Sequence, residues 1–168
     1  MLARAMAADC HDVVIISRRA QYSTCRTVGW DAENLGPWTS EVDSSDVVIN
    51  LAGRSVNCRY NAANRMEIID SRVKSTRAIG KAIAIASNPP KVWLQASTAT
   101  IYSHRFDDPN DEATGIIGGE EANVPDTWRF SIEVARAWEQ AANEAATPNT
   151  RKVLLRSAMT MSPERRQN

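Results

Sequence analysis

The segment Asp46-Val-Val-Ile-Asn-Leu-Ala-Gly53 decides the fold that this sequence predicts. Its short apolar run leads directly into a turn of small residues, and such a run is typical of a parallel strand buried on both faces. Open α/β sheets bind ligands at the carboxyl ends of their strands, where small side chains let a flat ligand approach the backbone. The turn is therefore a candidate ligand site, although similar turns also occur for structural reasons alone.

The composition is that of an ordinary globular protein. The chain has 168 residues, of which 43% are hydrophobic and 24% charged, and its formal net charge is +0. This length is enough for one domain with a core. Balanced charge gives no reason to expect a nucleic acid or an acidic membrane surface as a partner. The apolar runs reach only strand length, far short of the roughly 20 residues of a membrane span.

The cysteines, Cys10, Cys25 and Cys58, argue against both a zinc site and a disulfide framework. Their number is odd, and no pair has the C-x-x-C spacing of such sites. Free cysteines fit a reducing compartment. The amino-terminal residues show neither the apolar region of a signal peptide nor an arginine-rich transit pattern. We therefore expect a cytoplasmic protein without a metal site.

Hydrophobic periodicity predicts helices that alternate with strands. Helices are expected at residues 2–9, 61–86 and 126–146, a helical turn at 38–42, and strands at 13–16, 27–30, 46–50, 91–96 and 152–156. The predicted apolar stripes are Met66, Ile69, Val73, Thr76, Gly80 and Ile83 on one long helix, and Phe130, Val134, Trp138, Ala141 and Ala145 on the other. Asp126 or Thr127 is a candidate cap. Such alternation predicts an α/β fold with a doubly wound parallel sheet.

Several stretches resemble a known superfamily. The sequence Leu2-Ala-Arg-Ala-Met-Ala-Ala-Asp-Cys-His-Asp-Val-Val-Ile-Ile-Ser-Arg-Arg19 is similar to the first helix and second strand of extended short-chain dehydrogenase/reductases. Three further stretches, Val48-Ile-Asn-Leu-Ala-Gly53, Asp70-Ser-Arg-Val-Lys-Ser-Thr-Arg77 and Arg136-Ala-Trp-Glu139, resemble the atypical, nucleoside-diphosphate-sugar-epimerase-like members of the NAD-dependent epimerase/dehydratase family. The resemblance covers nearly the whole chain and implies a Rossmann-like fold.

The resemblance implies cofactor contacts at the ends of several strands. Ser17, Arg18 and Arg19 end the strand at which the family reads the adenosine ribose. Arginine there suits a 2′-phosphate and favours NADP over NAD. The alternative is that these residues are only an exposed basic loop without a binding role. Asp31 would face the adenine, or would cap a turn instead. The other implied contacts are Asn50, Leu51, Ala52, Gly53, Ser97 and Ser157.

The resemblance also implies catalytic roles for Thr98 and Tyr102. Thr98 lies where the family has a catalytic serine or threonine that orients a substrate carbonyl or alcohol, unless the backbone satisfies its hydroxyl. The family's Tyr-x-x-x-Lys pair, in which lysine lowers the pKa of the proton-exchanging tyrosine, is absent. Its positions hold Phe130 or Ser131 and Val134 or Ala135. Tyr102 could exchange the proton instead, but it has no obvious lysine partner and could simply close the loop.

The glycine-rich turn that holds a dinucleotide's pyrophosphate is also missing. The family places it after a first strand, whereas this sequence begins within the helix that follows, and the glycines at 115–119 lie too far along the chain to replace it. That strand is central in the order 3-2-1-4-5-6. Its neighbours at 13–16 and 47–50 should therefore keep unpaired backbone groups or pair with each other.

We expect residues 1–168 to form a single, partial Rossmann-like domain that lacks the first strand, the glycine-rich turn and the carboxyl-terminal substrate region. A partial reading frame or a misplaced start would explain this, and the upstream genomic DNA would test it.

The resemblance implies an NAD(P)-dependent epimerase/dehydratase or reductase acting on a sugar nucleotide or another carbonyl or alcohol, impaired in this form. The alternative is a non-catalytic nucleotide-binding or interaction module of the same fold, since the tyrosine and lysine are absent. A third reading is a degenerate remnant without activity. The expected partner is a small molecule such as a nucleotide sugar, and the two long helices could form a homodimer unless the sheet covers their apolar faces.

Overall fold

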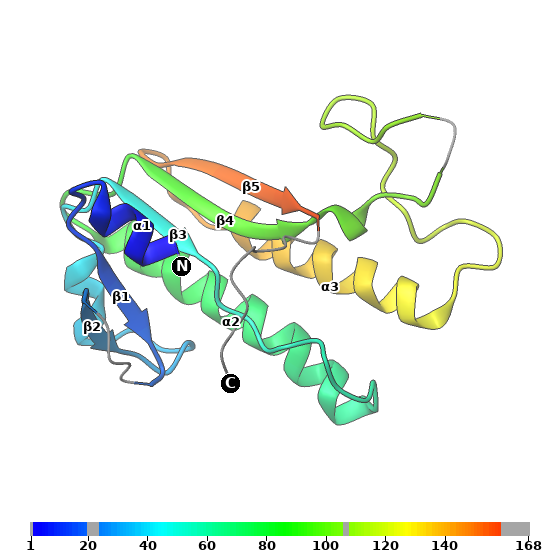
Figure 1. The fold of residues 1–168 in the computed structure, drawn as a ribbon, viewed down its shortest axis with the longest axis horizontal. Helices are drawn as coiled ribbons and strands as arrows, with labels where there is room; N and C mark the ends of the chain where they lie inside the picture. Colours follow the sequence, from blue (N-terminus) through cyan, green and yellow to red (C-terminus); the bar gives the residue numbers. More distant parts are fainter. Residues whose placement is uncertain (1, 20–23, 106–107, 159–168) are drawn as a thin grey trace.

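The computed structural model describes residues 2–19, 24–105 and 108–158. Its elements follow the predicted alternation along the chain (Figure 1). The helices are α1 (Leu2–Ala8), α2 (Ala62–Ile85) and α3 (Asp126–Asn143), with 3-10 turns η1 (Pro37–Glu41) and η2 (Ala99–Ile101). The strands are β1 (Val14–Ser17), β2 (Arg26–Gly29), β3 (Val47–Asn50), β4 (Val92–Thr98) and β5 (Arg151–Ser157). The predicted α/β class is confirmed.

The described strands form two separate parallel sheets. One sheet pairs β1 with β2, and the other has the order β3-β4-β5. Figure 1 shows the β1–β2 pair lying apart from the larger sheet. Within the described ranges β1 and β3 do not pair with each other, so each keeps one edge without a strand neighbour. This is the first of the two outcomes predicted for these two strands.

The two sheets share one hydrophobic core although no strand pairing joins them. The core is built around Trp38 of η1 and Trp93 of β4, together with apolar residues of α2. Ile16 of β1 and Val48 of β3 both pack against this same cluster. Side-chain packing therefore holds the β1–β2 pair against the rest of the molecule.

Helices α2 and α3 cover one face of the larger sheet. Along β4 the side chains alternate, with Trp93, Gln95 and Ser97 buried and the residues between them only half-buried. Such alternation is typical of a sheet with one fully covered face. The predicted apolar stripe of α3 is confirmed at Phe130, Val134, Trp138 and Ala141, which are buried, whereas Ala145 lies after the end of the helix and is half-buried.

Three sequence predictions about burial and capping are wrong. Val47 of β3 is 43% exposed rather than buried, because one sheet face is incompletely covered and β3 lies at a sheet edge. Met66 is 64% exposed because the first turns of α2 extend beyond the sheet (Figure 1). Pro125 occupies the cap position of α3 and makes no side-chain cap bond, so neither Asp126 nor Thr127 is the cap.

A buried polar cluster ties the end of β3 to its neighbours. Asn50 Nδ2 donates to Gln95 Oε1 at 2.9 Å and to Thr76 Oγ1 at 3.3 Å. The indole N–H of Trp138 also donates to Thr76 Oγ1, at 3.1 Å. Asn50, Thr76 and Gln95 are at most 2% exposed. Buried polar groups of this kind are stabilising only when their hydrogen bonds are satisfied, and Thr76 is the shared acceptor.

A second polar network ties α3 to the ends of β4 and β5. Glu139 accepts both Nε and Nη2 of Arg156 at 2.8 Å and the hydroxyl of Ser97 at 2.5 Å. The remaining guanidinium nitrogen, Nη1, donates to Tyr102 Oη at 2.8 Å. Burial opposes ionisation of Glu139, but the hydrogen bonds from Arg156 and Ser97 outweigh it and hold the Glu139 pKa below its ordinary value. The carboxylate is therefore a charged anchor inside the fold.

We expect Thr76→Val to destabilise the chain by about 1–3 kcal/mol, because the buried N–H groups of Asn50 and Trp138 lose an acceptor. Urea unfolding at neutral pH measures the change. Thr27→Val is the matched control, since the buried Thr27 hydroxyl has no hydrogen-bond partner and its removal should be close to neutral. Equal losses for the two variants would contradict a specific role for the cluster.

We expect Glu139→Gln to cost about 1–3 kcal/mol at pH 7 by leaving Arg156 without its counter-ion. The Glu139 pKa is lowered by folding, so this stabilisation is fully present above the ordinary value of 4.5 and is lost as the pH falls through the folded value. The difference between wild type and variant should therefore shrink in acid. Glu144→Gln, which removes an exposed ion pair with Arg77, should change stability little at any pH.

Candidate functional site

The carboxyl ends of β3, β4 and β5 lie along the same edge of the larger sheet. Asn50 pairs in register with Gln95, and Thr98, further along β4, pairs with Ser157. The structure therefore brings together three of the regions that the sequence assigned to a cofactor or substrate. Ligands of open parallel sheets bind at such an edge.

The basic residues predicted to read the ribose belong to the smaller sheet. Ser17 is the last residue of β1, and its hydroxyl accepts the backbone N–H of Arg19 at 3.3 Å. Arg18 and Arg19 are exposed. The Arg18 guanidinium makes no hydrogen bond or ion pair within the described ranges, so it is available to an external anion.

Asp31, the predicted adenine contact, caps a turn. One carboxylate oxygen accepts the backbone N–H groups of Glu33 at 2.9 Å and Asn34 at 2.7 Å, and the other accepts the Asn34 side chain at 2.8 Å. Hydrogen bonds from Asn34 and Glu33 lower the Asp31 pKa to about 2. Asp31 therefore has the turn-capping role that the sequence left open as an alternative, and both of its carboxylate oxygens already accept hydrogen bonds.

The turn after β3 presents its backbone and the side chain of Leu51 to the exterior. Leu51 is 60% exposed, whereas Asn50 is buried and accepts the Ala52 N–H at 3.0 Å. The missing side chain of Gly53 faces Arg72, since a Cβ there would come within 3.2 Å of the guanidinium carbon. Asn50 therefore fixes the shape of the turn through its bond with the Ala52 N–H. The absence of a side chain at Gly53 leaves space for Arg72 to lie against the turn.

The hydroxyl of Thr98 is engaged in the turn that follows β4. It donates to Thr100 Oγ1 at 2.9 Å and accepts the Thr100 backbone N–H at 3.2 Å. Ser157, its register partner, is exposed. Ser97 lies on the opposite, helix-covered face and is bonded to Glu139. Of these three hydroxyls, Thr98 and Ser157 share a face, and Ser97 does not.

Tyr102 has a cationic partner that the sequence did not reveal. Arg156 donates to its hydroxyl, and the guanidinium carbon lies 5.0 Å from the ring centroid. Tyr102 is only 8% exposed and forms an antiparallel bridge with Ile117. Gly115 lies so close to the ring that a Cβ would be 2.5 Å from one ring carbon. The tyrosine therefore closes the loop, and its hydroxyl also receives a charged donor.

The resemblance assigns the family's tyrosine to Phe130 or Ser131 and its lysine to Val134 or Ala135; Ser131 is half-buried and donates to the Thr127 carbonyl at 2.9 Å, and the other three are buried. Phe130 and Val134 are buried and form a cluster with Ile68 of α2. Arg65 lies over the Phe130 ring, with its guanidinium carbon 4.7 Å from the centroid. Phenylalanine and valine have no proton to exchange.

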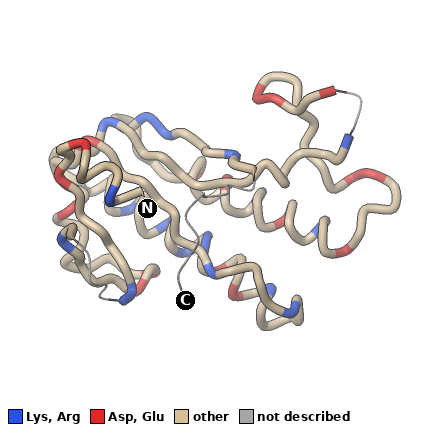
Figure 2. Tube along the Cα trace, in the orientation of Figure 1, with Lys and Arg blue, Asp and Glu red and all other residues tan. Residues whose placement is uncertain are grey.

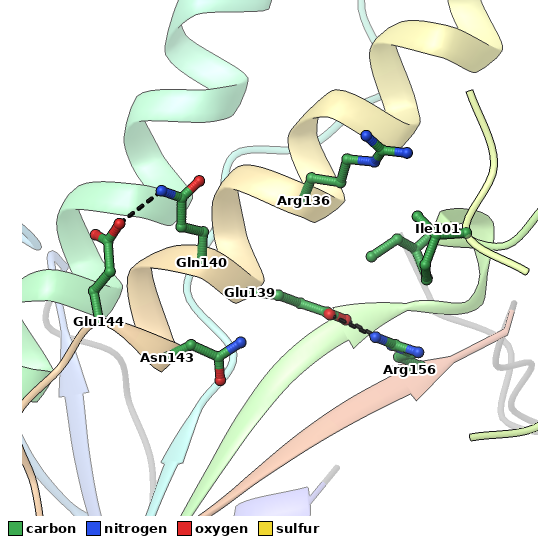
Figure 3. A pocket seen from close by; sticks show the side chains of 8 residues that line it. Ile101, Arg136, Glu139, Gln140, Asn143, Glu144 and Arg156 are labelled. Carbon is green, nitrogen blue, oxygen red and sulfur yellow. Dashed lines mark hydrogen bonds and ion pairs between the residues drawn. The ribbon is translucent and has the colours of Figure 1, made fainter. Parts of the chain in front are cut away.

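An open cavity of about 500 Å³ lies beside α3 and β5 (Figure 3). Its lining comprises Ile101, Ile117, Arg136, Glu139, Gln140, Asn143, Glu144 and Arg156. Arg156 is paired with Glu139, and Arg136 donates to the Gly118 carbonyl at 2.7 Å. β3 and β5 are the two outer strands of the sheet, with β4 between them. The cavity beside β5 is therefore separate from the Asn50–Gly53 turn, which follows β3.

Groups of metal-ligating side chains and helices able to span a membrane are both absent from the described ranges. Within those ranges, no group of three or more His, Cys, Asp or Glu side chains could hold a metal ion. None of the helices there combines the length and the apolarity needed to cross a bilayer. Figure 2 shows lysines and arginines interspersed with aspartates and glutamates along the trace.

Comparison with known sequences identifies a family. The model of the NAD dependent epimerase/dehydratase family matches residues 1–167. Epimerase family protein YfhF of Bacillus subtilis is 35% identical over 149 residues, which cover 87% of this chain and 46% of that protein. Epimerase family protein SDR39U1 of Bos taurus is 29% identical over 154 residues, which cover 90% of this chain and 47% of that protein. The chain spans about half the length of these relatives.

Solved structures agree with this assignment. Human epimerase family protein SDR39U1, solved with NADPH, matches with a TM-score of 0.72 at 27% identity, over 92% of this chain and 48% of that one. MoeE5, in complex with UDP-glucuronic acid and NAD, matches with a TM-score of 0.68 over 92% of this chain and 49% of that one; its 17% identity shows the fold alone. The chain therefore belongs to the NAD dependent epimerase/dehydratase family.

Proposed function

We propose that this chain is the dinucleotide-binding part of an NAD(P)-dependent epimerase or reductase. The observation that carries the proposal is the convergence of the Asn50–Gly53 turn, Thr98 and Ser157 at one edge of a parallel sheet. Family membership supports a nicotinamide dinucleotide as the ligand of that edge. Residues 1–168 would form a single, partial domain. The substrate would be a nucleotide sugar or another small carbonyl or alcohol compound.

We propose NADP rather than NAD as the preferred cofactor. The exposed guanidinium of Arg18, which has no partner among the described residues, follows β1, where a ribose 2′-phosphate would be read. Arginine binds phosphate through paired N–H donors and keeps its charge at any physiological pH. The human relative was solved with NADPH, which supports the same choice. The residues present thus fit the adenosine side of the cofactor.

The nicotinamide would supply hydride chemistry, and this chain would orient the substrate and move a proton. Thr98 would hold a substrate oxygen by exchanging its hydrogen bond with Thr100 for one to the substrate. Tyr102 would exchange the proton at its Oη, where the N–H of Arg156 would stabilise negative charge. Arg156 would then serve in place of the family's lysine, while Glu139 holds it in position.

A non-catalytic nucleotide-binding module is the second candidate. It is favoured by the limited exposure of Tyr102, whose ring packs against Gly115, and by the apolar residues Phe130 and Val134 at the usual catalytic positions. In that case the same edge would bind a nucleotide without turnover. The two functions differ in what Thr98 and Tyr102 do after binding.

We expect Arg18→Ala to weaken NADPH binding about tenfold or more while changing NADH binding little, because only NADPH carries the 2′-phosphate. Enhancement of NADPH and NADH fluorescence on titration with the 168-residue chain measures both affinities. Arg77→Ala, on the exposed side of α2, is the matched control and should leave both unchanged. An equal loss for the two cofactors would remove the case for phosphate recognition by Arg18.

We expect Thr98→Ala and Tyr102→Phe to lower the rate of hydride transfer about 100-fold or more, with dinucleotide affinity retained. The assay follows NADPH absorbance with carbonyl compounds and nucleotide sugars. If Tyr102 exchanges the proton, Tyr102→Phe should also abolish the basic or acidic limb of the pH–rate profile. Dinucleotide binding without any turnover in the wild-type chain would instead favour the non-catalytic module.

A further inference from the structure

Arg72 of α2 is a half-buried cation that lies directly beneath the turn after β3. Its guanidinium carbon is 5.0 Å from the centroid of the Trp138 ring. It also lies against Gly53, where a Cβ would come within 3.2 Å of the guanidinium carbon. The guanidinium is therefore in contact with both an indole ring and the turn that follows a parallel strand.

The charge of Arg72 has no counter-ion in the described part of the chain. Neighbouring arginines do have one, since Arg54 pairs with Glu67 and Arg65 pairs with Asp126. Burial lowers the pKa of Arg72 from its ordinary value, as expected for a desolvated cation without a carboxylate. An uncompensated charge in such a place opposes folding. A bound anion would remove this cost.

The donors that Arg72 leaves free form one edge of its guanidinium. Nη1 donates to the Ile68 carbonyl at 2.9 Å. Nε and Nη2 donate to no atom within the described ranges, and these two N–H groups point in parallel along one side of the plane. This is the paired arrangement with which arginine binds two oxygens of a phosphate.

The backbone of the turn adds a further donor. The Ala52 N–H is bonded to Asn50, and the Arg54 N–H is bonded to the Ser71 hydroxyl at 3.0 Å. The Gly53 N–H between them has no acceptor in the part of the chain that the structure describes. Gly53 and the Arg72 guanidinium are in contact, so this turn offers both a backbone N–H and guanidinium N–H groups as donors, which is the chemistry of an anion site.

We propose that Arg72 and the Gly53 N–H bind a phosphate group of a nucleotide ligand. That the ligand is a nucleotide rests on the proposed function, whereas the phosphate chemistry rests on Arg72 and Gly53 alone. A diphosphate is common to a dinucleotide and to a nucleotide sugar, so either molecule could supply the group. The experiment below separates these two sources.

The test measures binding of inorganic pyrophosphate, UDP and NADPH to the 168-residue chain by isothermal titration calorimetry, together with the Tm in each ligand. Arg72→Met removes the charge but keeps an unbranched stem that can pack on Trp138. Arg72→Lys keeps the charge but loses the paired donors. Arg77→Met, on the same helix, is the control because that arginine is exposed and already paired with Glu144.

We expect pyrophosphate to raise the Tm of the wild-type chain and of Arg77→Met. Arg72→Met should bind pyrophosphate about 10-fold to 100-fold more weakly, and Arg72→Lys about 10-fold more weakly. If only NADPH binding depends on Arg72, the phosphate belongs to the dinucleotide, and if only UDP binding does, it belongs to a nucleotide sugar.

The proposal is overturned if Arg72→Met binds all three compounds as the wild type does, or if the wild type itself binds no pyrophosphate. Should Arg72→Met fail to fold, Arg72→Lys decides, since wild-type affinity in that variant would also overturn paired-donor recognition. Pyrophosphate binding that depends on Arg72, without binding of NADPH or UDP, would support the anion site and contradict the proposed function. The two failures are therefore distinguishable.

Discussion

The hydrogen bonds that Thr76 makes with Asn50 and Trp138 hold the carboxyl end of β3 in place. Through them one hydroxyl joins a strand and two helices in a region without water access. Asn50 in turn accepts the Ala52 N–H, so the shape of the Asn50–Gly53 turn depends on how α2 and α3 pack. Because the Asn50 side chain is consumed in this cluster, a ligand above the turn would meet backbone atoms and Leu51 rather than the Asn50 amide. Recognition at such a place depends on shape and main-chain donors.

The division of the strands into two sheets limits how firmly Arg18 and the Asn50–Gly53 turn are held relative to each other. Arg18 follows β1, whereas the Asn50–Gly53 turn follows β3, and no hydrogen-bond ladder joins these strands within the described ranges. Their relative position rests on side chains such as Ile16 and Val48 around a common core. Contacts of this kind are less directional than a ladder, so the β1–β2 pair should open more readily than β4, which has a strand neighbour on both sides.

Local patterns in the sequence predicted most of the fold. Helix α2 and the strands appear near their expected positions because periodicity and signals such as Asn61, which caps α2, act over a few residues. Met66 and Val47 were wrongly expected to be buried because burial depends on what covers an element. The candidate site residues stay a prediction, although the structure brings Asn50, Thr98 and Ser157 to the carboxyl ends of neighbouring strands. The bond from Arg156 to Tyr102 joins residues 54 positions apart, and no local pattern indicates which arginine lies near which tyrosine.

The positions on α3 to which the resemblance assigns a tyrosine and a lysine carry no positive charge. Phe130 and Val134 leave that face of the helix apolar, while Arg156 on β5 and Arg72 on α2 bring guanidinium groups from other elements. These two arginines are not equivalent. Arg156 is neutralised by Glu139 through two hydrogen bonds, so its remaining N–H chiefly positions Tyr102. Arg72 has no such partner in the described ranges, and its guanidinium lies against Gly53 of the turn after β3. The fold therefore separates an arginine that is neutralised by a carboxylate from one that has no carboxylate partner among the described residues.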